Sequence, residues 1–195
     1  MAVSDGSFKD KFGTAAWVIE GRRSDGRLEG QCIIPGGPED QSAYRSELGG
    51  LYAIAAMVQV ICELHNIQEG SIEVACDGMN ALAQVGEADP IIRPNGAQYD
   101  IIAATQAKIK QTNIQWKMRH VMGHQDDTQG CTVMDRWETL NCMMDERAKQ
   151  HWQHHSTRTT RVQSAVDFEP WAVWMGRSKI CGRLAAQVIE HVRGT

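Results

Sequence analysis

The stretch SIEVACDG, residues 71–78, decides the fold of this chain. Its apolar residues Ile72, Val74 and Ala75 predict a buried strand, and Gly78 ends that strand directly after Asp77. In α/β sheets, ligands gather at the carboxyl ends of strands. The stretch therefore predicts an α/β sheet that presents the carboxylate of Asp77 at a functional edge.

Hydrophobic periodicity on either side predicts the rest of the sheet. Ile114, Trp116 and Met118 alternate with polar residues, which is typical of a half-buried strand. The expected strands are the one that contains Asp5 and those at residues 12–21, 27–35, 71–77 and 113–121; the expected long helices lie at residues 42–61 and 97–110. We expect an α/β fold with a five-stranded mixed sheet, helices on both faces, and Trp17 and Trp116 in the core.

Three further acidic residues occupy positions that suit a shared site. Asp5 closes a short strand, and Glu47 lies at the edge of the apolar stripe of the helix at residues 42–61. Asn141 and Asp145 lie four residues apart on one face of a later helix, on the flank of its apolar stripe. Taken singly, each acid is best interpreted as a solvated surface residue, so the argument depends on the set.

Together with Asp77 these acids make four carboxylates, which repel one another unless divalent cations bind among them. Two such ions, about 3.5–4 Å apart, can hold the attacking and leaving oxygens of a phosphoryl transfer. His124 follows Gly123 in a glycine-containing loop that suits a movable side chain. The pattern favours a two-metal phosphoryl-transfer site.

In their order and spacing, residues 5–7, 44–48, 76–77, 121–124 and 141–148 resemble the type 1 ribonuclease H family. The resemblance covers residues 1–150 and is strongest to the ribonuclease H domains of eukaryotic retroelement reverse transcriptases. It implies the ribonuclease H-like fold and a metal-dependent endonuclease that hydrolyses the RNA strand of RNA/DNA hybrids. It also implies two Mg²⁺ ions per site, for which Mn²⁺ can substitute.

The resemblance assigns roles to individual residues. Asp5, Glu47, Asp77 and Asp145 would be catalytic metal ligands, with Asp5 bridging both ions, and His124 would assist proton movement or product departure. Contacts to the hybrid would come from Gly6, Ser7, Ser42, Tyr44, Arg45, Ser46, Met79, Asn80 and Asn141. Among these, Ser42 or Arg45 would hold a phosphate of the DNA strand, and several others match positions that contact 2′-hydroxyl groups.

Two features favour the retroelement comparison. The loop from Gly123 to Asp127 is similar to that of retroelement domains, and residues 85–96 leave no room for the basic, tryptophan-bearing protrusion of some bacterial and cellular members. Only four residues precede Asp5. We therefore expect an excised segment of a polyprotein rather than a free-standing gene product, with a reverse transcriptase domain as a neighbouring partner.

The charge of the chain predicts weak intrinsic affinity for nucleic acid. Its 20 Lys and Arg against 24 Asp and Glu give a net charge of −4 and a pI near 6.0, so no global field attracts a polyphosphate. Phosphate contacts would be local, and the candidates are Lys9, Lys11, Arg22, Arg23 and Arg45.

The chain has 195 residues, of which 42% are hydrophobic, enough for one full core. We expect a catalytic domain at residues 1–155. Residues 156–195 would form a linker and an extension, with a hairpin at 171–180 and a final helix, that packs on the main domain or on a partner. The sequence shows neither a transmembrane segment nor a signal peptide, so we expect no membrane partner.

The six cysteines lie mostly in apolar segments without a paired framework, so we expect reduced thiols in an intracellular protein. A zinc site would draw on Cys131, Cys142, His151, His154 and His155. Their irregular spacing favours a helix end rich in surface histidines instead.

Two other functions stay open. A noncatalytic hybrid-binding or scaffolding module would fit the acidic charge, although such a module would not need all four acids. A resolvase-type or transposase-type DNA nuclease would share the carboxylates but not readily the His124 loop. A proofreading exonuclease is disfavoured because Ser7 stands where that class needs a second acid.

Overall fold

The computed structural model describes residues 1–21, 26–86, 98–123, 134–156, 174–175, 178–179 and 184–193. Five strands form one sheet in the order β3-β2-β1-β4-β5. Their bounds are β1 Ala2–Lys9, β2 Phe12–Glu20, β3 Arg27–Ile33, β4 Ser71–Cys76 and β5 Gln115–His120. β1 pairs antiparallel with β2 and β2 with β3, whereas β4 runs parallel to β1 and β5. The expected mixed sheet is confirmed.

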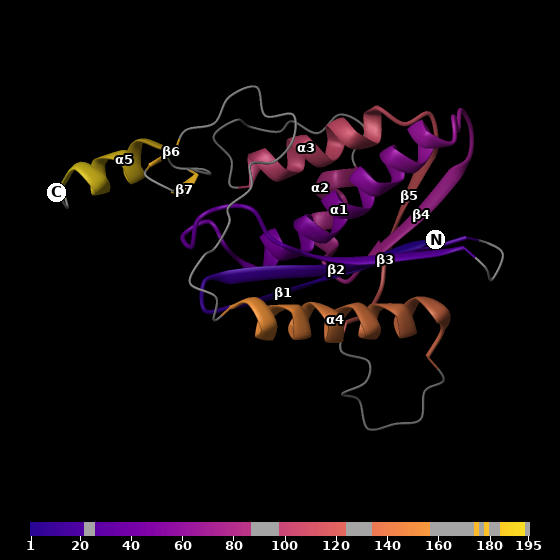
Figure 1. Cartoon of the computed structure of the whole chain (residues 1–195), viewed down its shortest axis with the longest axis horizontal. Helices are drawn as coiled ribbons and strands as arrows, with labels where there is room; N and C mark the ends of the chain where they lie inside the picture. Colours follow the sequence, from indigo (N-terminus) through magenta and orange to yellow (C-terminus); the bar gives the residue numbers. More distant parts are fainter. Residues whose placement is uncertain are drawn as a thin grey trace.

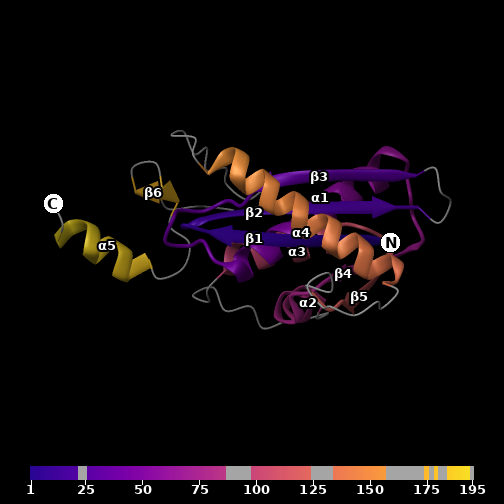
Figure 2. The same ribbon diagram turned by 90° about the horizontal axis from the view of Figure 1, so that it is seen from below.

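Helices cover both faces of this sheet, as expected (Figure 1). α1 (Ala43–Leu64), α2 (Met79–Gly86) and α3 (Tyr99–Lys110) lie on one face, and α4 (Arg136–His155) lies on the other. Seen from below, α4 crosses in front of the sheet (Figure 2). Trp17 is buried and Trp116 is partly buried against the same core cluster, which confirms the expected core role of both.

α1 packs on β1 because small residues allow a close approach. A Cβ atom at Gly6 would lie 2.5 Å from the backbone carbon of Ser46 and 2.6 Å from the backbone nitrogen of Glu47. Only glycine fits there. The helix begins at Ser42, whose Oγ accepts a hydrogen bond from the backbone N–H of Arg45 at 3.0 Å. The contact at Gly6 brings Glu47 next to the strand residue that precedes Gly6, Asp5.

α4 begins with a capping box, in which the side chains of Asp135 and Glu138 each accept a backbone N–H of the other residue. The apolar stripe predicted for this helix consists of Trp137, Leu140, Met144 and Ala148; the last three are buried, and Trp137 is partly buried against the same cluster. These side chains pack against residues of β1, β2 and β4. With this face turned to the sheet, Asn141 and Asp145 come to lie along β1.

By length and composition alone, α1 is apolar enough to cross a membrane, with a mean hydropathy of 1.4 in an 18-residue window. A buried core helix passes the same test, so the expectation of no membrane-spanning run stays a prediction. In the structure, 44% of that window is buried inside the protein, and Leu48, Ile54 and Val58 belong to the core cluster. The apolar character of α1 is that of a core helix.

Beyond residue 156, β6 (Trp174–Met175) pairs antiparallel with β7 (Ser178–Lys179), which confirms a hairpin within residues 171–180. α5 (Leu184–Arg193) follows and lies beyond the end of the main sheet in both views (Figures 1 and 2). The boundary at residue 155 and the packing of the extension stay predictions.

Candidate metal centre

The carboxyl end of β4 lies beside the middle of β1. β1 continues to Lys9, so the expectation that Asp5 closes a short strand is wrong. The parallel register pairs Ala2 with Val74 and Val3 with Ala75, and two residues further along each strand this register brings Asp5 level with Asp77. Glu47 reaches this point from α1, and Asp145 reaches it from α4 on the opposite face. Four separate elements thus supply the four predicted carboxylates.

Electrostatics show that the four carboxylates act on one another. Asp5 is only 5% exposed. Burial, and then the charges of Glu47, Asp77 and Asp145, raise its pKa to about 9. Burial, and then the charge of Asp77, raise the pKa of Glu47 to about 8. The backbone N–H of Gly6 hydrogen-bonds to both carboxylates and offsets part of this cost. Without a cation, this site retains protons that carboxylates normally release.

Glu47, Cys76 and Asp77 lie close together, with one ligand atom of each within 4.8 Å of the others. The Cys76 thiol donates to Oε2 of Glu47 at 3.2 Å, and its sulfur accepts the backbone N–H of Gly78 at 3.1 Å. Burial, and then the Glu47 charge, raises the pKa of Cys76 well above its usual value, so the group stays a thiol at neutral pH. Sequence reasoning missed this contact and treated Cys76 only as a buried reduced thiol.

Within the described part of the chain, one carboxylate oxygen of Asp77 lacks a hydrogen-bond donor or a cationic side chain. Its Oδ1 is buried and, among the residues that the structure describes, no hydrogen bond reaches it. Gly123 lies against the same carboxylate, since a Cβ there would be 2.4 Å from Oδ2 of Asp77. A buried anionic oxygen in a set of carboxylates is the hard donor environment that Mg²⁺ prefers. The residues present therefore fit a magnesium site.

Asp145 lies at the open side of the cluster. Its side chain is 17% exposed and forms an ion pair with Lys149 at 2.6 Å, one turn further along α4. Across the ranges 1–21, 26–86, 98–123 and 134–156, no Lys or Arg side chain pairs with Asp5, Glu47 or Asp77. Negative charge is thus compensated only at the edge of the cluster.

The predicted hybrid contacts divide into exposed and buried residues. Met79 is 62% exposed and Asn80 is exposed, both at the start of α2, which is separated from Asp77 by Gly78. Gly6, Ser7, Ser42 and Tyr44 are half-buried.

Ser46 is fully buried, and its Oγ donates to the backbone oxygens of Ser7 at 3.2 Å and Ser42 at 3.1 Å. Asn141 is 1% exposed and donates to Asp5. The contact roles of the half-buried and exposed residues stay predictions, whereas the Ser46 side chain joins α1 to β1.

The interpretation of Arg45 as a phosphate or substrate contact is wrong. Its side chain is 0% exposed and donates to both carboxylate oxygens of Asp100, at 2.8 and 2.6 Å. It also donates to the backbone oxygen of Pro35 at 2.7 Å and to Oε1 of Gln98. The guanidinium ties α1 to the start of α3 and is not presented to a ligand.

The remaining basic candidates differ in availability. Lys9 is exposed and lies over the Trp152 ring, 5.3 Å from its centroid. Lys11 forms an exposed ion pair with Glu39 at 2.6 Å. His124, Arg22, Arg23 and Cys131 lie outside the described residues.

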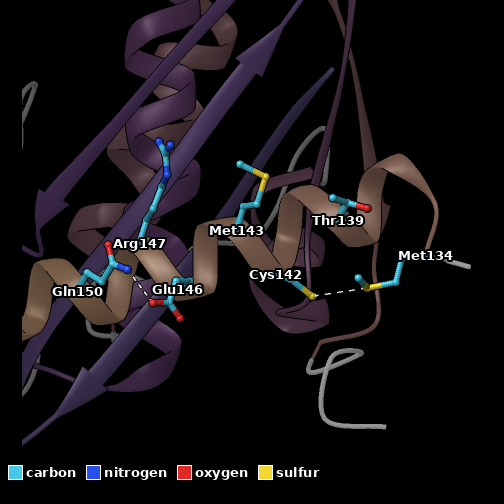
Figure 3. Close-up of a pocket in the computed structure, with 7 residues that line it drawn as sticks. All are labelled: Met134, Thr139, Cys142, Met143, Glu146, Arg147 and Gln150. Atoms are coloured by element: carbon cyan, nitrogen blue, oxygen red, sulfur yellow. Dashed lines mark hydrogen bonds between the residues drawn. The ribbon is translucent and has the colours of Figure 1, made fainter. Parts of the chain in front are cut away.

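A pocket of about 430 Å³ lies along α4 (Figure 3). Its wall is mostly apolar and includes Met134, Cys142 and Met143. None of the four carboxylates lines it. The chemistry suggested by the cluster therefore does not belong to this pocket.

No protein-family model and no curated protein matches the chain. Solved structures do match it. The structure of LC11-RNase H1 in complex with an RNA/DNA hybrid has 13% sequence identity and a TM-score of 0.56, over 76% of this chain and 93% of that chain. A second structure of LC11-RNase H1, isolated from compost by a metagenomic approach, has 15% identity and a TM-score of 0.50, over 77% and 95%.

The chain is therefore an α/β protein with a ribonuclease H-like fold. More specifically, it is structurally similar to RNase H1 at low sequence identity. This confirms the expected fold. The link to retroelement reverse transcriptases stays a prediction.

Proposed function

We propose that this protein is a metal-dependent endonuclease that hydrolyses the RNA strand of RNA/DNA hybrids. The observation that carries the proposal is the cluster of four carboxylates around Asp5 of β1 and the carboxyl end of β4, in which burial and mutual repulsion raise the pKa of Asp5 to about 9. A protein that only needed to be stable would not gather these charges. The fold is that of LC11-RNase H1, a protein solved with a bound hybrid.

Asp5, Glu47, Asp77 and Asp145 would hold two Mg²⁺ ions, and Mn²⁺ would substitute because it prefers similar oxygen ligands. When bound, the ions supply an activated water at the scissile phosphate and stabilise the charge of the departing 3′ oxygen. Asp5 is the most buried of the four and feels the charge of all three others, which suits a ligand shared by both ions.

Several uncharged groups hold the ligands in place. The amide of Asn141 orients Asp5, the Cys76 thiol holds Glu47, and Gly123 itself lies against Asp77. His124, which comes next in sequence, would carry protons or help the product depart. Met79, Asn80, Ser7, Ser42, Tyr44 and the backbone at Gly6 would contact the hybrid.

The test is cleavage of an end-labelled RNA/DNA hybrid in Mg²⁺, beside duplex RNA, duplex DNA, single strands and a sample with EDTA. We expect cleavage of the RNA strand of the hybrid alone, and none in EDTA. Asp5→Asn should remove the activity, whereas Glu146→Gln is a matched control because Glu146 is an exposed acid next to Asp145 on α4. Full cleavage by Asp5→Asn would contradict the proposed centre.

The same panel, extended by a branched DNA and by a measurement of hybrid binding, separates the alternatives. Cleavage of branched or duplex DNA with the hybrid intact would indicate a resolvase-type or transposase-type nuclease. Binding of the hybrid without cleavage under all metal conditions would indicate a noncatalytic module.

A further inference from the structure

The last turns of α4 carry three histidines, His151, His154 and His155. The rings of His151 and His155 lie 4.3 Å apart between centroids, with an angle of 52° between their planes. The rings of His154 and His155 are farther apart, at 6.1 Å. Residues four apart on a helix share one face, so His151 and His155 form a pair there, half-buried at the helix surface.

Two imidazoles at this spacing offer a pair of nitrogen donors to one ion. Burial, and then the charges of His155 and His154, lower the pKa of His151, which keeps a lone pair available at neutral pH. Two histidines four apart on one helix face are also the spacing that zinc enzymes use to hold their ion. Imidazole suits Zn²⁺, Ni²⁺ and Cu²⁺, whereas Mg²⁺ prefers oxygen ligands.

The pair is separate from the carboxylate cluster. With a rise of about 1.5 Å per residue, His151 and His155 lie about 9 and 15 Å further along the α4 axis than Asp145. Cys142 is not part of the pair, because it lies more than two turns before His151 and contacts the sulfur of Met134 at 4.0 Å. The irregular spacing that argues against a closed zinc site of cysteines and histidines therefore does not apply to an open site made by two histidines.

We propose that His151 and His155 form a second metal site, which takes one ion of the Zn²⁺, Ni²⁺ or Cu²⁺ class and leaves the remaining positions to water or an external ligand. The ion would join two successive turns at the end of α4 and so stabilise that end of the helix. His154 is not required. The site does not depend on the proposed nuclease function.

The proposal is tested by calorimetric titration of the full chain with NiCl₂ in millimolar Mg²⁺, so that the carboxylate cluster is occupied throughout. Ni²⁺ should bind once per chain at pH 7.5, and lowering the pH to 5.5 should weaken binding because the imidazoles take up protons. His151→Gln and His155→Gln should each weaken the binding by about tenfold or more, because a single imidazole cannot chelate. His154→Gln is the matched control, with less than about a threefold change expected.

A second measurement is independent of calorimetry. Ni²⁺ should raise the Tm of the wild type and of His154→Gln, and should leave the Tm of the His151→Gln, His155→Gln double variant unchanged. Far-UV circular dichroism checks that each variant is folded. Undiminished Ni²⁺ binding by the double variant would overturn the proposal, and so would an equal loss in His154→Gln.

Discussion

The side-chain amide of Asn141 donates to Oδ2 of Asp5 at 3.2 Å, and so joins α4 to β1 at the centre of the carboxylate cluster, across 136 positions of sequence. Both side chains are buried, with exposed fractions of 1% and 5%. Because the amide is uncharged, it orients the carboxylate without neutralising it. Asp5 is therefore held in a fixed place while its need for a cation persists.

Replacing Asp5 should separate catalysis from folding. Asp5→Asn removes the most repelled carboxylate, so we expect no hybrid cleavage and a metal-free protein that is about 1–3 kcal/mol more stable at pH 8. Urea unfolding in EDTA measures the stability, and Glu146→Gln provides the control with little change in either property. A clear loss of stability in Asp5→Asn would show that repulsion does not dominate at this position.

The stability of the metal-free protein should fall as the pH rises from about 4 to 9. In this window the unfolded chain releases the Asp5 proton near its ordinary pKa of 3.8, while the folded protein keeps it up to a pKa of about 9. The stabilisation is fully present below about pH 4 and is lost as the pH passes through the folded-state pKa. Glu47, with a pKa of about 8, contributes in the same direction.

This pH dependence is measured by urea unfolding in EDTA at pH 5, 7 and 9. The difference between wild type and Asp5→Asn should shift in favour of the variant at each step. Addition of Mg²⁺ at pH 8 should raise the Tm of the wild type and should have a much smaller effect on Asp5→Asn. A pH-independent difference between the two proteins would rule out the raised pKa.

The Cys76 thiol should matter as a hydrogen-bond donor to Glu47. Cys76→Ala removes the donor and should weaken Mg²⁺ binding by about 3–10-fold, corresponding to the usual 0.5–1.5 kcal/mol of one hydrogen bond. Cys76→Ser keeps a donor and should bind Mg²⁺ within about threefold of the wild type. Titration calorimetry with Mg²⁺ distinguishes them, and equal losses in both variants would assign the effect to packing alone.

Arg45 should be a stability residue. Arg45→Met leaves Asp100 buried without its partner, so we expect a loss of about 3–5 kcal/mol in the free energy of unfolding. The double variant Arg45→Met, Asp100→Leu should recover much of this loss, because no unpaired charge remains. Urea unfolding of the two variants measures the effect, and a fully stable Arg45→Met would contradict the buried ion pair.

Hybrid binding should be weak and dependent on salt. With Ca²⁺ in place of Mg²⁺ to suppress turnover, the logarithm of the association constant should fall linearly with the logarithm of salt concentration. Lys9→Ala should reduce the steepness of this dependence by about 0.7–0.9 if Lys9 contacts one phosphate. Lys117→Ala, an exposed lysine on β5, is the control. Tight binding that is nearly independent of salt would contradict the electrostatic account.

Much of the fold is predictable because short segments determine it. The apolar run before Asp77, the alternation in β5 and the stripe of α1 each report burial within a few residues, and all three elements lie as predicted. Element ends differ by a few residues. α3 begins at Tyr99 rather than at residue 97, and its N-cap Gln98 adopts a left-handed conformation without a side-chain cap.

The contacts between distant segments are not predictable in this way. The pairing of Arg45 with Asp100 depends on how α1 meets α3, and nothing near either residue specifies the partner. The Cys76 contact depends on a 3.2 Å approach between a strand and a helix. The burial of Arg45 and its partner Asp100 are both visible only in the packed structure.

The bare backbone at Gly6 has one more consequence. A methyl group there would collide with the peptide of Ser46 and Glu47, and the helix would have to retreat from the strand. Such a variant would retain every ionisable side chain but would increase the distance between the helix that carries Glu47 and the strand that carries Asp5. The spacing of the two carboxylates therefore depends on the absence of a side chain at residue 6. Gly6→Ala would therefore be an inactive protein that keeps all of its charged side chains.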